Sequence, residues 1–360
     1  MSYRMILVGT GGQGRNWCER FIPPNVADGL VEVVAAVDVN PDALQNARTY
    51  LGLRADQCYL DAKQAMDENP ADFAAIVTPP AWHEPIVDLA LAHDLHILSE
   101  KPIADTLDAS IRVADKVAAA GKKMGVTMSH RFDQDKTTLR EELRSGRYGR
   151  LDYLACRVSN DNRKYASWGR YRHEMLDPLM IEAAGHRLDI LADLAGAPAS
   201  TLFVQTWKPD WAEYKGDCQA LGIISYDNGV RAQWECVKAN AVGLNPPGRE
   251  YLRAECEGGT LILSNRQLQR FVYDPARQNR NELEGQGEVV PLIEQPKWAN
   301  AWLIEKFVHW LDGGEAMETN VWDNVRTVAM TWAAIESSRT GQPVCMEPFI
   351  SAARQRLSAY

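Results

Sequence analysis

The feature that most constrains the fold is an alternation of short apolar runs and helical segments over residues 1–127. The apolar runs are nearly continuous, which is typical of strands buried on both faces of a sheet. Between them, apolar residues recur at the spacing of one helix face, as at positions 86, 87, 90 and 91. Six such alternations predict a doubly wound parallel sheet. The expected strands cover residues 3–9, 31–38, 57–60, 73–78, 95–99 and 123–128.

The helices between these strands carry recognisable start and stop signals. The first is expected to open at Gln13 and to stop near Pro23 and Pro24, because proline interrupts a helix interior. Asp61 is expected to cap the helix that follows the third strand. The other expected helices cover residues 42–51, 82–93 and 106–120.

The first strand runs into the segment GTGGQG, residues 9–14, which matches the pattern G-x-G-x-x-G. Gly9 permits a tight turn, Gly11 lets the backbone approach a pyrophosphate, and Gly14 lets the helix pack close to the strand. The helix N-terminus offers N–H groups and its dipole to phosphates. In this context the segment predicts a dinucleotide-binding Rossmann domain whose cofactor contacts include Gly12 and Gln13. A glycine-rich turn without a ligand is the alternative.

Asp38 ends the second strand, 24 residues after Gly14. A carboxylate at this place accepts hydrogen bonds from the adenosine ribose hydroxyls and repels a 2′-phosphate. We therefore expect Asp38 to bind the cofactor and NAD to be preferred over NADP.

After residue 127 the alternation stops, and strand-like segments follow one another with short turns. Such a run predicts a large, mainly antiparallel open sheet in a second, α+β domain, with domains at 1–127 and 128–360. Asn228 and Gly229 suit positive φ in a hairpin turn. The expected strands cover residues 153–159, 201–207, 218–226, 230–238, 251–258, 259–264 and 268–274, and the helices 133–145, 177–195, 299–312 and 321–339. A free apolar face on that sheet favours a homodimer or homotetramer.

Composition excludes several classes of partner. The net charge of −9 argues against nucleic acid, because phosphate binding needs a basic surface. No apolar run approaches the roughly 20 residues of a membrane helix, so no membrane partner is expected. The seven cysteines are scattered without a CxxC pair, which favours reduced thiols in a cytoplasm and no metal site.

Three segments could carry chemistry. In the first, HDLHILSEKPI, the fifth strand ends in Glu100 and Lys101, followed by Pro102. Ligands of a parallel sheet bind at the carboxyl ends of its strands, so Lys101 could hydrogen-bond a substrate oxygen, with Glu100 as its charge partner or facing away. A solvated strand end is the alternative.

The second segment, IEAAGHRLDIL, places Glu182, His186 and Asp189 at spacings of four and three. On a helix these residues share one face. A carboxylate near an imidazole fixes its tautomer and raises its basicity, so His186 is a candidate proton acceptor. A polar stripe with a satisfied histidine is the alternative.

The third segment, RKYASWGRYRHEM, interleaves basic and aromatic residues. Aromatic planes and forked donors suit a polyhydroxylated or anionic sugar ring, and a basic surface loop is the alternative. The candidate substrate contacts here are Arg163, Tyr165, Trp168, Arg172 and His173, beside Lys164, Arg170 and Tyr171.

Together these motifs, with VDVNPD, VTPPAWHEP, SEKP, GHRLD and the closing TNVWDNVRTVAMTWAAIESSRTGQPV, occur in the order of a known family. The chain resembles the Gfo/Idh/MocA family of NAD(P)-dependent oxidoreductases, such as glucose–fructose oxidoreductase and inositol dehydrogenase. The resemblance implies a Rossmann domain, an oligomer-forming open sheet, and substrates among sugars, cyclitols and their derivatives.

The resemblance also implies roles for single residues. It makes Lys101 the family's Glu-Lys-Pro lysine and His186 its proton acceptor, with Glu182 where the family commonly has an aspartate. The segment SHRFD differs from the family's more usual asparagine-containing version, and we expect its His130 to contact the substrate. The residues expected to line the cofactor are Thr78, Pro79, Pro80, His83, Glu100 and Lys101.

Three functions are compatible with this sequence. The first is an NAD-dependent dehydrogenase that moves a hydride between nicotinamide and a carbinol carbon of a sugar, sugar acid or cyclitol. The second is an NAD-dependent glycoside hydrolase that uses transient oxidation at C3 and elimination. The third is a cofactor-bound regulator without activity, for which neither Lys101 nor His186 would be needed.

Overall fold

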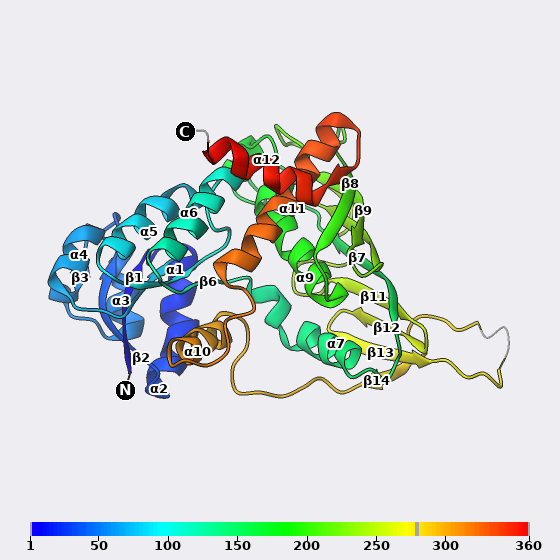
Figure 1. The fold of residues 1–360 in the computed structure, drawn as a ribbon, viewed down its shortest axis with the longest axis horizontal. Coiled ribbons are helices and arrows are strands. Elements are labelled where there is room, and N and C mark those ends of the chain that lie inside the picture. Colours follow the sequence, from blue (N-terminus) through cyan, green and yellow to red (C-terminus); the bar gives the residue numbers. More distant parts are fainter. Residues whose placement is uncertain (1, 278–280, 359–360) are drawn as a thin grey trace. The chain divides into compact units, whose positions relative to one another are not determined.

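The computed structural model describes residues 2–277 and 281–358 and divides into two compact units. The first unit combines the chain up to Ser129 with Pro296–Val328 and the segment from Ala353 onward. The second consists of His130–Gln295 and Ala329–Ala352. The sequence predicts one cut at residue 127, whereas the chain returns twice to the first unit. Figure 1 follows this path in colour from the N-terminus to the C-terminus.

The first unit contains a six-stranded parallel sheet in the order β3-β2-β1-β4-β5-β6. The predicted doubly wound sheet is thereby confirmed. The strand order reverses between β1 and β4, and ligands of such sheets bind outside the carboxyl ends at this point. The strands are β1 (Tyr3–Val8), β2 (Val31–Val37), β3 (Cys58–Tyr59), β4 (Phe73–Ile76), β5 (His96–Ser99) and β6 (Met124–Val126).

The helices of this unit begin close to the expected positions. Asp61 caps α4 as predicted, since its carboxylate accepts a hydrogen bond from the backbone N–H of Gln64 at 2.8 Å. The helices are α1 (Gln13–Asn16), α2 (Ile22–Ala27), α3 (Leu44–Leu51), α4 (Ala62–Glu68), α5 (His83–Ala92), α6 (Leu107–Ala119) and α10 (Ala299–Leu311).

The expected helix end near Pro23 and Pro24 is wrong, because both prolines lie in the first turn of α2. A π-helical turn over Trp17–Phe21 connects α1 to α2, and the backbone N–H of Ile22 donates to the carbonyl of Trp17. The two prolines then occupy positions whose missing N–H groups cost no helical hydrogen bond.

Helix α10 belongs to the first unit because its residues pack there. The side-chain amide of Asn25 on α2 donates to the carbonyl of Ala301 on α10 at 3.0 Å. Phe307 on the same helix meets Phe73 of β4 edge-to-face, with ring centroids 5.3 Å apart. These contacts join segments more than 230 residues apart, which local sequence patterns do not reveal.

The second unit is built on a nine-stranded sheet in the order β14-β13-β12-β11-β7-β10-β9-β8-β15. It is mainly antiparallel, as predicted, with one parallel pair formed by β7 and β10. The two-residue β15 and the short β14 were not expected. A segment of two or three residues is too short to show the alternation that marks a strand. The strands are β7 (Leu151–Ser159), β8 (Ala199–Trp207), β9 (Gln219–Tyr226), β10 (Arg231–Val237), β11 (Tyr251–Cys256), β12 (Gly259–Ser264), β13 (Gln267–Val272), β14 (Glu288–Val290) and β15 (Val344–Cys345).

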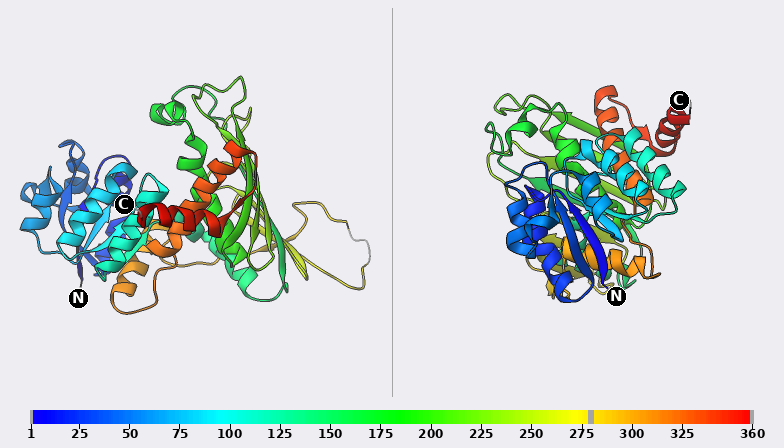
Figure 2. Two further views of the ribbon diagram at one scale, coloured as in Figure 1. Left: turned by 45° about the horizontal axis from the view of Figure 1, so that its top comes forward. Right: turned by 90° about the vertical axis from the view of Figure 1, so that its left-hand side faces the viewer.

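Helices α7 and α9 pack against one face of this sheet (Figure 2). On the other face Leu221 and Ile223 of β9 are 46% and 59% exposed, so apolar side chains reach the surface of the chain there. The remaining helices are α7 (Gln134–Arg144), α8 (Arg170–Glu174), α9 (Gly185–Ala195), α11 (Val321–Thr340) and α12 (Met346–Ser358). No helix in the described ranges is long and apolar enough to cross a membrane.

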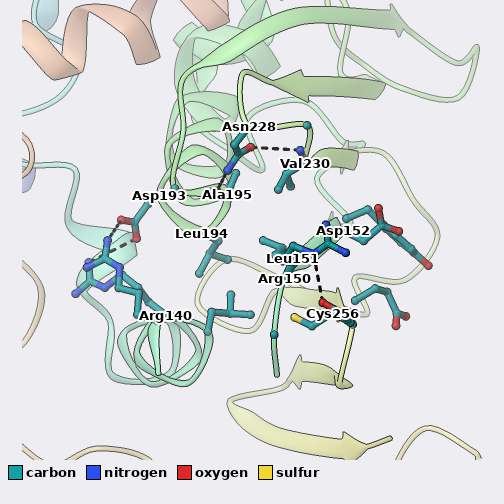
Figure 3. A pocket seen from close by; sticks show the side chains of 18 residues that line it. Arg140, Arg150, Leu151, Asp152, Asp193, Leu194, Ala195, Asn228, Val230 and Cys256 are labelled. Atoms are coloured by element: carbon teal, nitrogen blue, oxygen red, sulfur yellow. Dashed lines mark hydrogen bonds and ion pairs between the residues drawn. The ribbon is translucent and has the colours of Figure 1, made fainter. Parts of the chain in front are cut away.

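The hairpin between β9 and β10 forms at the predicted place, with one difference. Gly229 has a φ of 88°, whereas the φ of Asn228 is not positive. Asn228 acts through its side chain instead: its amide donates to the carbonyl of Ala195 at 2.8 Å, and its oxygen accepts from the N–H of Val230 at 3.2 Å (Figure 3).

Candidate active site residues

The glycine loop has the geometry of a phosphate cradle. A Cβ atom on Gly9 would lie 2.3 Å from the carbonyl oxygen of Val77, and one on Gly14 would lie 2.3 Å from the carbonyl oxygen of Gly9. Gly9 and Gly12 have φ values of 98° and 50°, and a Cβ on Gly12 would meet no atom within 4 Å. The backbone is therefore fixed on the strand side and open on the other, which fits a dinucleotide.

Asp38 closes this cradle from the end of β2. Its Oδ2 accepts hydrogen bonds from the backbone N–H groups of Thr10 and Gly11 at 2.8 and 2.9 Å, and its Oδ1 accepts from the N–H of Asn40 at 2.9 Å. A side-chain carboxylate thus fixes the loop and lies beside it, where the sequence predicts contact with a ribose.

His83 is completely buried at the start of α5. Its Nδ1 lies 2.8 Å from the carbonyl oxygen of Pro102, and its Nε2 lies 2.8 Å from that of Thr78. Burial lowers the pKa of this imidazole, and the two carbonyls oppose that change. His83 therefore joins the segment after β4 to the turn after β5, rather than presenting its ring at a surface. Pro79 in the same segment is exposed.

The turn after β5 separates Glu100 from Lys101. The Glu100 side chain points into the unit, where its Oε1 accepts from the indole N–H of Trp17 at 2.8 Å and from the amide of Asn300 at 3.0 Å. Lys101 is half-buried, and its peptide bond to Pro102 is cis. Within the described residues, the Lys101 ammonium forms no ion pair. Of the two arrangements left open by the sequence, Glu100 faces away.

In the second unit, His186 on α9 is buried and stacks on His130. Their ring centroids are 3.8 Å apart and their planes differ by 4°. Asp189, one turn later, is ion-paired with Arg131, whose Nε donates to its Oδ2 at 2.7 Å. The two histidines expected to act on the substrate are therefore in direct contact.

Glu182 lies in a π-helical turn, Met180–Ala184, which precedes α9. Its Oε2 accepts from Nε of Arg172 at 3.0 Å and from the hydroxyl of Tyr171 at 3.1 Å. Burial and the nearby Glu182 carboxylate raise the pKa of Tyr171 to about 12. Glu182 thus connects the helix of His186 to the basic and aromatic segment.

That segment, residues 163–175, is largely neutralised by neighbouring acids. Arg163 pairs with Asp161 at 2.9 Å, and Lys164 pairs with Glu213 at 2.8 Å. His173 is buried and stacks on Tyr214, with ring centroids 4.0 Å apart. Its ring nitrogens lie 3.1 and 3.3 Å from backbone carbonyls, so it serves the packing of the segment.

Tyr165 and Trp168 differ in how they are held. The Tyr165 hydroxyl donates to Glu174 at 2.8 Å on an exposed part of the segment. Trp168 packs against a buried cluster that includes Tyr214 and Cys218. The guanidinium of Arg172 lies 5.0 Å from the Trp168 ring centroid. Lys238, which the sequence did not single out, lies 4.3 Å from the same centroid.

A hollow of about 1020 Å³ elsewhere in the second unit contains none of these candidates (Figure 3). It lies beside the ends of α7 and α9. Two of the arginines that line it, Arg140 and Arg144, are ion-paired with Asp193, at 3.5 and 3.2 Å.

Comparison with known proteins identifies the chain. Residues 3–128 match the oxidoreductase family with an NAD-binding Rossmann fold, and residues 140–346 match its C-terminal alpha/beta domain. The chain belongs to the Gfo/Idh/MocA family. As a member of that family it is an NAD(P)-dependent oxidoreductase, and the resemblance seen in the sequence is confirmed.

Individual Gfo/Idh/MocA relatives match along almost the whole chain. An uncharacterized protein of Sinorhizobium fredii, y4oX, is 51% identical over 98% of both chains. An inositol 2-dehydrogenase of Pseudarthrobacter chlorophenolicus is 24% identical over 96% of both. The crystal structure of an oxidoreductase from Agrobacterium radiobacter, in complex with NAD+, L-tartaric acid and magnesium, has a TM-score of 0.80 at 21% identity. The alignment covers 97% of this chain and 99% of that one, so the two share a fold.

Proposed function

We propose that this protein is an NAD-dependent dehydrogenase that oxidises a carbinol group of a sugar, sugar acid or cyclitol. The observation that carries the proposal is the turn after β5, at the carboxyl edge of the nucleotide-binding sheet. Glu100 is held inside the unit by Trp17 and Asn300, and His83 holds the carbonyl of Pro102. Lys101, between these two anchors, keeps an ammonium that no described carboxylate neutralises.

Bound NAD supplies the hydride acceptor. We assign Lys101 the task of donating a hydrogen bond to the substrate oxygen that becomes a carbonyl. We assign His186 the task of accepting the hydroxyl proton, as an imidazole does near neutral pH. Its stack on His130 restricts the orientation of the ring. Glu182 acts through Arg172 and Tyr171, which it fixes in position.

Three observations favour the cofactor and the substrate class. The carboxylate of Asp38 at the end of β2 favours NAD, because it would repel the 2′-phosphate of NADP. The match to an inositol 2-dehydrogenase over nearly the whole chain favours a polyhydroxylated substrate. The aromatic ring of Trp168, with the Arg172 guanidinium 5.0 Å and the Lys238 ammonium 4.3 Å from its centroid, belongs to a cluster of a kind that suits such a substrate.

The test is NADH formation with a panel of sugars, sugar acids and cyclitols. His186→Ala removes the proton acceptor and Lys101→Ala removes the hydrogen-bond donor to the reacting oxygen, so each is expected to lower kcat by at least about a hundredfold. Lys164→Ala, which removes an exposed lysine paired with Glu213, is the matched control. Intact turnover in both site variants would contradict the assignment. Glycoside cleavage that requires NAD but yields no net NADH would favour the hydrolase instead.

We also propose that the open face of the second sheet forms the interface of a homodimer or homotetramer. Leu221 and Ile223 on β9 are exposed there, and such an apolar surface favours burial against a second copy. Sedimentation velocity of wild type and Ile223→Arg tests this: the variant should dissociate. A wild-type monomer would contradict the proposal.

A further inference from the structure

Lys238 lies at the end of the parallel strand pair in the second sheet. It directly follows β10, and Asn160 directly follows β7. Val237 pairs with Ser159 in that ladder, so the two residues meet at the same edge. Lys238 is only 2% exposed. A buried ammonium normally needs a carboxylate partner, because desolvation of an unpaired charge is costly.

No such partner is present in the described chain. The Lys238 ammonium donates to Oδ1 of Asn160 at 2.9 Å and lies over the Trp168 ring. An amide oxygen and a ring face stabilise a cation but leave its charge uncompensated. Burial accordingly lowers the pKa of Lys238 to about 8, from its ordinary value of 10.5.

Lys136 in the same unit shows the ordinary solution to the same burial. Its ammonium lies 2.9 Å from Glu250, 3.2 Å from Asp133 and 3.3 Å from Asp135. These acids raise the pKa of Lys136 despite its burial. Lys136 and Lys238 are both buried, but only Lys136 has acidic partners among the described residues. Burial alone therefore does not explain why Lys238 lacks a counterion.

The backbone around Lys238 is fixed from both sides. Its N–H lies 2.9 Å from the side-chain oxygen of Gln219 and 3.0 Å from the carbonyl of Cys218. Its carbonyl accepts from the N–H of Asn162 at 2.7 Å. A lysine held at its backbone and at its ammonium is preorganised, which lowers the cost of binding a ligand.

Lys238 also lies beside the candidate substrate residues. The Trp168 ring is shared by Lys238 and Arg172, and Arg172 is paired with Glu182, four residues before His186. Arg163 and Lys164 in this segment have acidic partners, and Arg170 is exposed to solvent. Lys238 is therefore the buried cation beside Trp168 whose charge no described acid compensates.

We propose that Lys238 binds the carboxylate of an acidic polyhydroxylated substrate, such as a sugar acid or a cyclitol acid, and selects it over neutral analogues. This rests on the proposed dehydrogenase function for the identity of the ligand as a substrate. The carboxylate would replace the missing counterion with a charge-assisted hydrogen bond, and the substrate ring would lie against Trp168.

Calorimetric titration of the full chain with NAD present tests this without turnover. The probes are D-glucuronate, D-galacturonate, quinate and L-tartrate, with D-glucose, D-galactose and myo-inositol as neutral counterparts. At least one acid should bind, and Lys238→Met should weaken it by about tenfold or more, the value of a hydrogen bond to a charged group. Lys238→Arg should restore part of the affinity, and Lys164→Met should change nothing.

Thermal unfolding separates this role from a structural one. Lys238→Met should unfold at a temperature equal to or above that of wild type, because it removes an uncompensated buried charge. A bound acid should raise the unfolding temperature of wild type and not of the variant. The proposal is overturned if no acid binds, if the variant binds acids as wild type does, or if only neutral polyols bind.

The proposed function can fail separately. If NADH forms with neutral substrates alone, the proposed role of Lys238 is contradicted, whereas the proposed dehydrogenase function is supported. If acids bind through Lys238 but no NADH forms, the proposed binding site is supported, whereas the proposed dehydrogenase function is contradicted.

Discussion

The imidazole rings of His130 and His186 lie parallel, with centroids 3.8 Å apart. His130 precedes α7 and His186 lies on α9, so the stack joins two segments of the second unit. If His186 accepts the substrate proton, the stack limits the directions in which its ring nitrogens can point.

The first prediction concerns this orientation. His130→Ala should lower kcat by about tenfold, because a loosely held base loses alignment with the proton that it accepts. His130→Phe, which keeps a flat ring in place, should retain most of the activity. Steady-state kinetics with the substrate found in the panel measures both variants. Equal loss in the two would show that His130 acts through its nitrogens rather than by stacking.

The second prediction concerns His83, whose ring bridges the carbonyls of Thr78 and Pro102. His83→Ala should reduce the free energy of unfolding by about 1–3 kcal/mol, because buried carbonyls lose their partner. It should also lower kcat, since the turn that carries Lys101 loses an anchor. Denaturant unfolding and kinetics measure the two effects. The control His93→Ala removes a histidine paired with the largely exposed Asp67 and should alter neither strongly.

The third prediction concerns cofactor choice. Asp38→Ala removes the acceptor that fixes Thr10 and Gly11 and the charge that opposes a 2′-phosphate. NADH affinity should fall by about tenfold or more, the cost of hydrogen bonds to a charged group, and the preference for NADH over NADPH should shrink. Fluorescence titration with both nucleotides measures this. An unchanged ratio of the two affinities would mean that Asp38 serves only the loop.

The fourth prediction concerns pH. The pKa of Lys238 is lowered to about 8, chiefly by burial; nearby Arg187 and Arg172 also lower it, whereas Cys236 and Glu250 oppose the change. Below this value the ammonium is charged, so affinity for a carboxylate should be constant there and should fall as pH rises through about 8. In Lys238→Arg the fall should disappear, because a guanidinium stays protonated. Calorimetry across pH measures both.

The same titration affects stability with a definite sign. Between about 8 and 10.5 the unfolded chain keeps the proton of Lys238 and the folded chain releases it. The unfolded state then binds more protons, so this residue makes the free energy of unfolding rise with pH across that interval. Lys238→Met should remove that contribution, which denaturant unfolding at several pH values would detect.

The sequence by itself determined the strands of both sheets except the short β14 and β15, together with the glycine loop and the Asp61 cap. These features depend on residues close together in the chain: strands buried on both faces need continuous apolar runs, and a cap needs one acceptor three residues before a free N–H. The family motifs likewise marked Lys101 and His186 without any knowledge of their surroundings.

Only the tertiary structure decided what those side chains contact. Glu182 and Asp189 were expected to share a face with His186, and the structure shows that they also bind arginines from other segments, Arg172 and Arg131. The role proposed for Lys238 depends on the pairing of β10 with β7. This pairing brings Asn160, 78 residues earlier in the chain, to the Lys238 ammonium. The physical reason is that counterions, ring stacks and burial arise from strand pairing and packing between distant segments, and a local pattern carries no record of its distant partner.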